Sequence, residues 1–144
     1  MMNFIVAIGF LALGVGAMLQ ASGQSADDRF AQVRARALGM SVYGELCASC
    51  HGRTGHGDGP RIPELNAKPS DLTRLAQRNG WTFPAESVAR VIDGSDRAHQ
   101  TSEMPRWGDV FRGDQALADE AAVNERIKAL TLYLEFIQLR QYRR

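Results

Sequence analysis

Two cysteines and a histidine fall within five residues in the segment Cys47-Ala48-Ser49-Cys50-His51. Residues three apart lie on one face of a helix, so Cys47 and Cys50 can form thioether bonds to two substituents of one planar ring. The imidazole of His51 follows at once and can ligate iron at the ring centre. Cys-x-x-Cys-His is the attachment signature of a c-type haem, which is the leading hypothesis for this segment.

Three other kinds of site use cysteines at this spacing. A redox dithiol is expected after a strand and at the start of a helix, whereas residues 34–50 are predicted to be helical throughout. A structural zinc site needs four ligands, and beyond the signature the chain offers no cysteine and only His56 and His99. A disulfide between the two cysteines would leave the adjacent histidine without a role. The haem hypothesis is favoured because it uses every cysteine of the chain.

Met104 is the candidate ligand for the opposite face of the iron. Pro105 follows it and keeps the backbone of Met104 extended, so that a loop can present the thioether. The alternative is a core methionine that fills a gap. Met40 lies on the helix that carries the signature and cannot reach the opposite face. His99, five residues before Met104, remains a competing ligand.

The glycine-rich stretch 52–59 is predicted to be a turn that brings the chain back around the haem edge. A ligating histidine usually donates its second ring N–H to an acceptor that fixes the ring orientation. The carbonyl of Pro60 is the first candidate acceptor for His51, and that of Pro63 is the second. The alternative is that both prolines only stiffen the loop.

Two apolar residues complete the predicted pocket. Leu65 is expected to contact the ring, and Trp107 is expected to pack beneath the loop of Met104. Basic residues on the segments around the haem edge would form a positive rim that steers an acidic partner. The alternative, given a net charge of +1, is a mixed solvated surface. These basic residues are Arg53, Arg61, Lys68 and Arg106.

Helical patterns on both sides of this centre predict its scaffold. Gly39, Tyr43 and Cys47 recur at intervals of four, and an amphipathic helix is predicted over residues 119–141. The two helices are expected to cross near Gly39 and Tyr43, with Tyr133 or Phe136 opposite. A further helix is predicted over residues 84–93, ending before Gly94. Ser70 is the candidate cap of a short helix that ends near Gly80.

The length of 144 residues suits one domain, and the net charge of +1 argues against nucleic-acid binding. Residues 4–19 carry no charge, which fits a cleaved export signal or a retained N-terminal membrane anchor. Small residues at 21–23 favour cleavage there. We therefore predict a signal peptide or anchor over residues 1–23 and one domain over residues 24–144.

In these motifs the chain resembles the class I c-type cytochromes of bacteria. The resemblance covers about residues 34–141 and implies an all-α cytochrome c fold, with about three to five helices and loops around one covalently bound haem c. It implies axial ligation by His51 and Met104. It also implies export to the periplasm, in soluble form or anchored to the outer face of the inner membrane. The matching stretches are Gly39 to Gly52 with the signature, Gly59-Pro60, Met104 to Gly108, and Leu130 to Leu134.

The resemblance implies a one-electron carrier between respiratory or dehydrogenase partner proteins, and not an enzyme in its own right. The alternative from another class is the haem subunit of a multi-protein oxidoreductase complex. A haem enzyme or sensor with a labile distal ligand is disfavoured, because His56 and His99 lie in polar loops with no evident acid–base partner.

Overall fold

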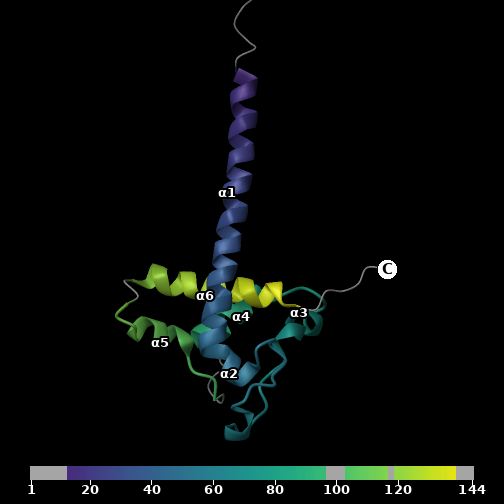
Figure 1. Ribbon diagram of the computed structural model, residues 1–144, viewed down its shortest axis with the longest axis vertical. Helices are drawn as coiled ribbons and strands as arrows, with labels where there is room; N and C mark the ends of the chain where they lie inside the picture. The colour runs from purple at the N-terminus through teal and green to yellow at the C-terminus, as the bar shows by residue number, and fades with distance from the viewer. Residues whose placement is uncertain (1–12, 97–102, 117–118, 139–144) are drawn as a thin grey trace, which may run out of the picture. The chain divides into compact units, whose positions relative to one another are not determined.

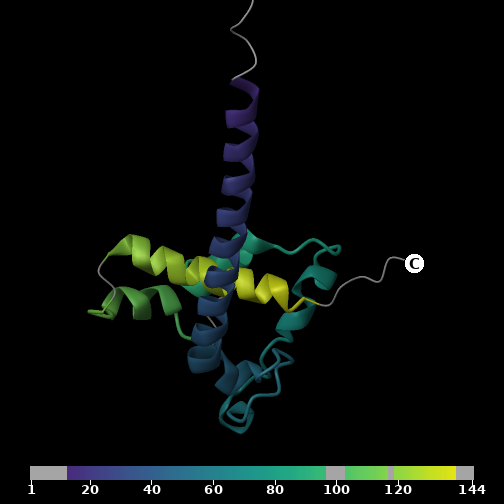
Figure 2. The ribbon, with the colours of Figure 1, turned by 45° about the horizontal axis from the view of Figure 1, so that its top comes forward.

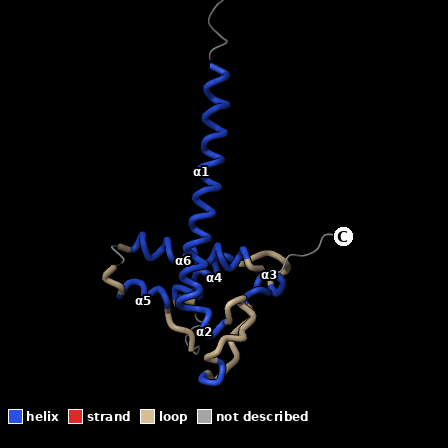
Figure 3. Tube along the Cα trace, in the orientation of Figure 1, coloured by secondary structure: helices blue, strands red, loops and turns tan. Residues whose placement is uncertain are grey.

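The computed structural model describes residues 13–96, 103–116 and 119–138. These residues form helices and loops and contain no strand, as predicted for an all-α fold (Figure 3). The chain divides into two compact units, residues 1–33 and 34–144. Helix α1, Leu13–Val42, begins in the first unit and ends in the second. No helix within the described ranges combines the length and the apolar run that a membrane crossing requires. Cleavage near residue 23 stays a prediction.

The helix that leads to the cysteines widens before it reaches them. After α1, residues Tyr43–Cys47 form a π-helical turn, η1, and Ala48–His51 form the short helix α2. The N–H of Ala48 donates to the carbonyl of Tyr43, five residues back. Helix was predicted throughout this stretch, but the wide turn was not. A hydrophobic pattern over so few residues does not distinguish a π turn from an α turn.

The core of the second unit is built on α6, Glu120–Phe136. The carboxylate of Asp119 accepts a hydrogen bond from the N–H of Ala122 at 3.0 Å and caps its start. The helix is shorter than the predicted 119–141. Helix α4, Ala85–Asp93, packs on α6 and ends at the left-handed Gly94, as predicted. The buried side chains of α6 are Val123, Ile127, Ala129, Leu130, Thr131, Tyr133 and Leu134.

The chain leading to η1 crosses α6 (Figures 1 and 2), and Gly39 is in close contact with α6 at Ala129 and Tyr133. A Cβ atom at Gly39 would lie 2.6 Å from the carbonyl carbon of Ala129 and 2.9 Å from the Cβ of Tyr133. Only glycine permits this approach. One turn later the rings of Tyr43 and Tyr133 pack with centroids 5.1 Å apart. The predicted crossing is therefore confirmed, with Tyr133 opposite.

Helix α5, Trp107–Gly113, was not predicted. The rings of Trp107 and Phe111 stack at 6.4 Å, an i,i+4 aromatic pair that was a usable signal for a short helix. Helix α5 packs on both α4 and α6. Arg112 joins the three helices, because its guanidinium donates to Asp93 at 2.7 Å and to Glu120 at 3.1 Å.

Short helices shape the middle of the chain. These are η2 (Ile62–Glu64), η3 (Leu72–Arg74) and α3 (Leu75–Arg78). The prediction that Ser70 caps the helix here is wrong, because the carboxylate of Asp71 accepts the N–H of Thr73 at 2.9 Å. Asp71 lies one residue nearer the helix, at the N-cap position from which its short side chain accepts the N–H two residues further on.

Candidate haem-binding site

A cavity of about 640 Å³ opens beside α2, and its size suits a cofactor site. Cys47, Cys50 and His51 line it together with Met104, which is more than fifty residues downstream. Leu65 and Trp107 line it as well, whereas Pro60 does not. The rest of the wall is largely apolar. It includes Leu46, Leu72, Leu75, Val88, Val91, Ile92, Leu130 and Leu134.

Cys47 and Cys50 are both free thiols, which excludes the disulfide alternative in this structure. Burial raises the pKa of the Cys47 thiol to about 12, with a smaller effect from neighbouring Cys50. A thiol in this state differs from the attacking cysteine of a redox dithiol, whose pKa is lowered to favour the thiolate. No group of three or more His, Cys, Asp or Glu side chains in the described part of the chain is placed to hold a metal ion. This geometry gives no support to the zinc alternative.

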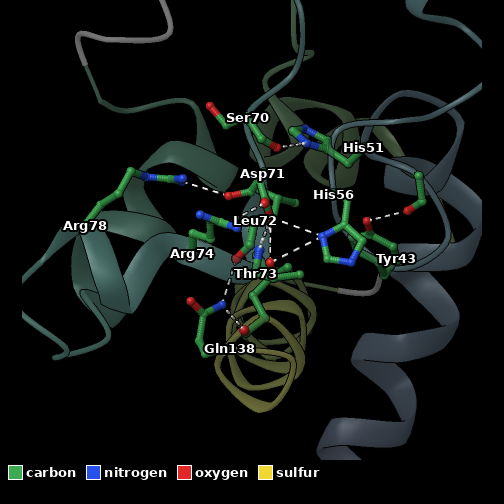
Figure 4. A network of polar contacts seen from close by, with 12 residues as sticks. Tyr43, His51, His56, Ser70, Asp71, Leu72, Thr73, Arg74, Arg78 and Gln138 are labelled. Atoms are coloured by element: carbon green, nitrogen blue, oxygen red, sulfur yellow. Dashed lines mark hydrogen bonds and ion pairs between the residues drawn. The ribbon is translucent and has the colours of Figure 1, made fainter. Parts of the chain in front are cut away.

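His51 is oriented by a carbonyl, as predicted, but not by that of Pro60 or Pro63. Its Nδ1 lies 3.1 Å from the carbonyl oxygen of Ser70 (Figure 4). The assignment to Pro60 is therefore wrong. Because a carbonyl oxygen only accepts, Nδ1 donates, and the lone pair is on Nε2. Burial lowers the pKa of His51, although the bond to Ser70 opposes this shift. A neutral imidazole with a free Nε2 is the form that ligates metals.

Asp71 fixes the segment that carries the Ser70 carbonyl (Figure 4). Its carboxylate accepts from the hydroxyl of Thr73 at 2.6 Å and pairs with Arg74 at 3.2 Å. Its Oδ1 also lies 3.6 Å from Nδ1 of His56. Burial raises the pKa of Asp71, but the hydrogen bonds from Thr73 and the electrostatic effects of His56 and Arg74 outweigh it and lower the pKa overall. The Asx-type spacing of Asp71 and Thr73 was a sequence signal for this support.

The glycine-rich loop is anchored to α2 by backbone hydrogen bonds. The N–H groups of Gly57, Gly59 and Arg61 donate to His51, Cys50 and Ser49 at 2.8, 3.1 and 3.0 Å. They satisfy carbonyls that a helix end otherwise leaves without partners. A Cβ atom at Gly59 would lie 2.5 Å from the carbonyl carbon of Cys50, so a larger residue cannot follow this path. The loop holds the signature in place.

Met104 lies between residues 97–102, which the structure does not describe, and the start of α5. It borders the same cavity as His51, but its role as a ligand stays a prediction. The competing candidate His99 lies outside the described residues. Trp107 both lines the cavity and packs against the buried core, and its expected place beneath the Met104 loop stays a prediction.

The predicted positive rim is partly neutralised. Arg61 pairs with Glu64 at 2.9 Å, and Arg106 pairs with Asp109 at 3.1 Å. Lys68 and Arg61 border the cavity. The surface near the opening is therefore mixed in charge and not uniformly basic.

The donor set fits a haem held through two cysteines and one histidine, since two partly buried thiols and a neutral imidazole border one largely apolar cavity. No curated protein and no solved structure matches the chain significantly. The family model described as "Cytochrome C oxidase, cbb3-type, subunit III" matches residues 34–123, more than half of the chain. The chain thus belongs to this family of c-type cytochrome domains, which hold haem c covalently and transfer electrons.

Proposed function

We propose that this protein is a one-electron carrier with a single haem c attached to Cys47 and Cys50 and ligated by His51 and Met104. The observation that carries the proposal is the cavity that brings Met104 to the same apolar space as the signature. When bound, the haem supplies a reversible one-electron couple. With a protein ligand on each side of the iron, no position is left for substrate.

The surrounding residues suit transfer without chemistry on a substrate. Ser70 fixes the ring of His51, and the loop from Gly52 to Arg61 holds the signature backbone. A soft thioether ligand together with histidine raises the reduction potential relative to other ligand sets. We propose that respiratory or dehydrogenase partners exchange electrons with the protein outside the cytoplasm, where c-type domains typically occur.

The test replaces Met104 with alanine in protein produced by a host that attaches haem c. Met104→Ala should abolish the iron–sulfur absorption of the oxidised protein, lower its potential and admit cyanide to the iron. Haem should still survive acid denaturation, because attachment depends on Cys47 and Cys50. Met40→Ala is the matched control, since Met40 is 58% exposed on α1.

Two outcomes would contradict the proposal. A haem that acidified organic solvent extracts would refute covalent attachment. A Met104→Ala protein with the wild-type spectrum and potential would refute the Met104 assignment, and His99 would be the next ligand to replace.

The family match favours a second candidate, the haem subunit of a multi-protein oxidoreductase complex. The electron-transfer role is then the same, but the partner is permanent. Gentle extraction of the native protein followed by size-exclusion chromatography distinguishes the two. Elution with larger subunits at a fixed ratio supports the complex, whereas elution alone from the soluble fraction supports the mobile carrier.

A further inference from the structure

Two hydrogen bonds join distant segments at the edge of the cavity. The backbone N–H of Asn66 donates to Oε2 of Glu103 at 2.7 Å, and its side-chain amide donates to Oε1 at 2.9 Å. Both carboxylate oxygens are therefore used by one residue, 37 positions earlier in the chain. Hydrogen bonds to an ionised carboxylate are stronger than those between neutral groups.

This Asn66–Glu103 clip lies directly beside the candidate distal ligand. Glu103 precedes Met104, and both border the cavity together with Asn66. On the other side of Met104, Pro105 restricts the backbone, and Trp107 begins α5 in the packed core. Only three residues separate the clip from that helix. The path of Met104 is thus constrained at both ends.

The opposite end of the clip is anchored as well. The N–H of Leu65 donates to the carbonyl of Ile62 at 3.1 Å, and that of Glu64 donates to Arg61 at 2.9 Å. Arg61 is in turn bonded to the signature backbone through its N–H to Ser49. Hydrogen bonds, together with the short chain segment from Arg61 to Asn66, therefore link the segment that carries His51 to the residue before Met104.

We propose that Asn66 and Glu103 are positioning residues that hold the Met104 segment across the cavity and determine how readily the Met104 sulfur is displaced. The inference rests on the proposed function, because it takes Met104 as the distal ligand. Neither residue needs to touch the iron. Their effect comes from limiting the positions that the Met104 backbone can adopt.

Glu103→Gln tests the clip in the full-length, haem-loaded protein. An amide in place of the carboxylate sets a donor against one of the two Asn66 donors and removes the charge from the remaining bond. Glu64→Gln is the matched control, because it makes the same chemical change in η2 at an exposed ion pair with Arg61. Asn66→Ala is the second variant, and it removes only the side-chain bond.

Two measurements are made on each variant. Hydrogen exchange of the Asn66 backbone amide, read by NMR against that of Leu65, reports the clip itself. Imidazole titration of the oxidised protein, read through the iron–sulfur absorption, reports displacement of the sulfur. For Glu103→Gln we expect about tenfold faster amide exchange and about five- to tenfold tighter imidazole binding, the order expected for the net loss of one ordinary hydrogen bond. Asn66→Ala should tighten imidazole binding by less, and Glu64→Gln should leave both readouts unchanged.

The Met104→Ala variant separates the possible failures. If Met104→Ala loses the sulfur absorption while Glu103→Gln binds imidazole as the wild type does, the positioning role is overturned and the proposed ligation stands. Equal effects of Glu64→Gln and Glu103→Gln on imidazole binding would also overturn the positioning role. The effect would then come from the loss of a negative charge near the cavity opening and not from the clip. If Met104→Ala leaves the absorption intact, the ligand assignment fails, and this inference fails with it.

Discussion

Gly39→Ala places a methyl group where the chain meets α6. The new Cβ would lie 2.6 Å from the carbonyl carbon of Ala129 and closer still to its oxygen. These are backbone atoms of a buried helix, so the clash cannot be relieved by a side-chain rotation. Overpacking of this kind costs about 3 kcal/mol at the upper end of its usual range. Alanine's better helix propensity offsets about 1 kcal/mol, which leaves a net loss of about 2 kcal/mol.

Gly44→Ala is the matched control for this substitution. Gly44 is also helical, but it is exposed, and a Cβ atom at this position would meet no neighbouring heavy atom within 4 Å. It should gain up to about 1 kcal/mol from propensity alone. In a domain of this size, about 1 kcal/mol shifts the melting temperature by roughly 4 °C. On that scale Gly39→Ala should melt about 8 °C below the wild type, and Gly44→Ala should melt at or slightly above it.

Thermal unfolding of the haem-loaded proteins, followed by far-ultraviolet circular dichroism, measures the difference. Equal melting temperatures for the two variants would refute the close approach at Gly39. A lower melting temperature in both variants would mean that the destabilisation comes from alanine within the helix and not from the contact of Gly39 with α6.

Three further substitutions test the supports of the site. Tyr43→Phe removes the buried hydroxyl that donates to the carbonyl of Gly52 at 2.7 Å. The free energy of unfolding, measured with urea, should fall by about 1 kcal/mol. The control Tyr133→Phe leaves that hydrogen bond intact. Asp71→Asn tests linkage: the pKa of Asp71 is lowered on folding, so its ionised form stabilises the fold above its ordinary value of 3.8 and this contribution disappears as the pH falls below it. The variant's melting temperature should therefore fall less steeply on acidification, and a slope equal to that of the wild type would contradict the assignment. Asp119→Ala removes the cap of α6 and should cost about 0.5–2 kcal/mol in the same urea assay, a neutral result being the contrary outcome.

Residue types with distinct chemistry made the centre predictable from sequence. The cysteine spacing, the adjacent His51 and the Pro-restrained Met104 all belong to one cavity, and Gly39 with Tyr43 identified the helix crossing. The carbonyl partner of His51 was missed because every residue carries the same acceptor, so only the path of the chain selects Ser70 over Pro60. The Asn66–Glu103 clip was not predicted for a related reason, since no local sequence pattern links two residues that are 37 positions apart.

The wide turn Tyr43–Cys47 also bears on how many residues must separate Gly39 from the signature. Each α-helical residue rotates the side-chain direction by about 100° around the helix axis. The number of residues in the turn therefore sets the directions of the side chains after it relative to those before it. Gly39 must face α6, while Cys47, Cys50 and His51 must face the cavity. The wide turn lies between Gly39 and the last residues of the signature, so it contributes to the rotation that separates them. Deletion of one residue there would rotate the cysteines by about 100° relative to Gly39. The interval between Gly39 and Cys47 should therefore resist insertion and deletion even where its side chains tolerate exchange.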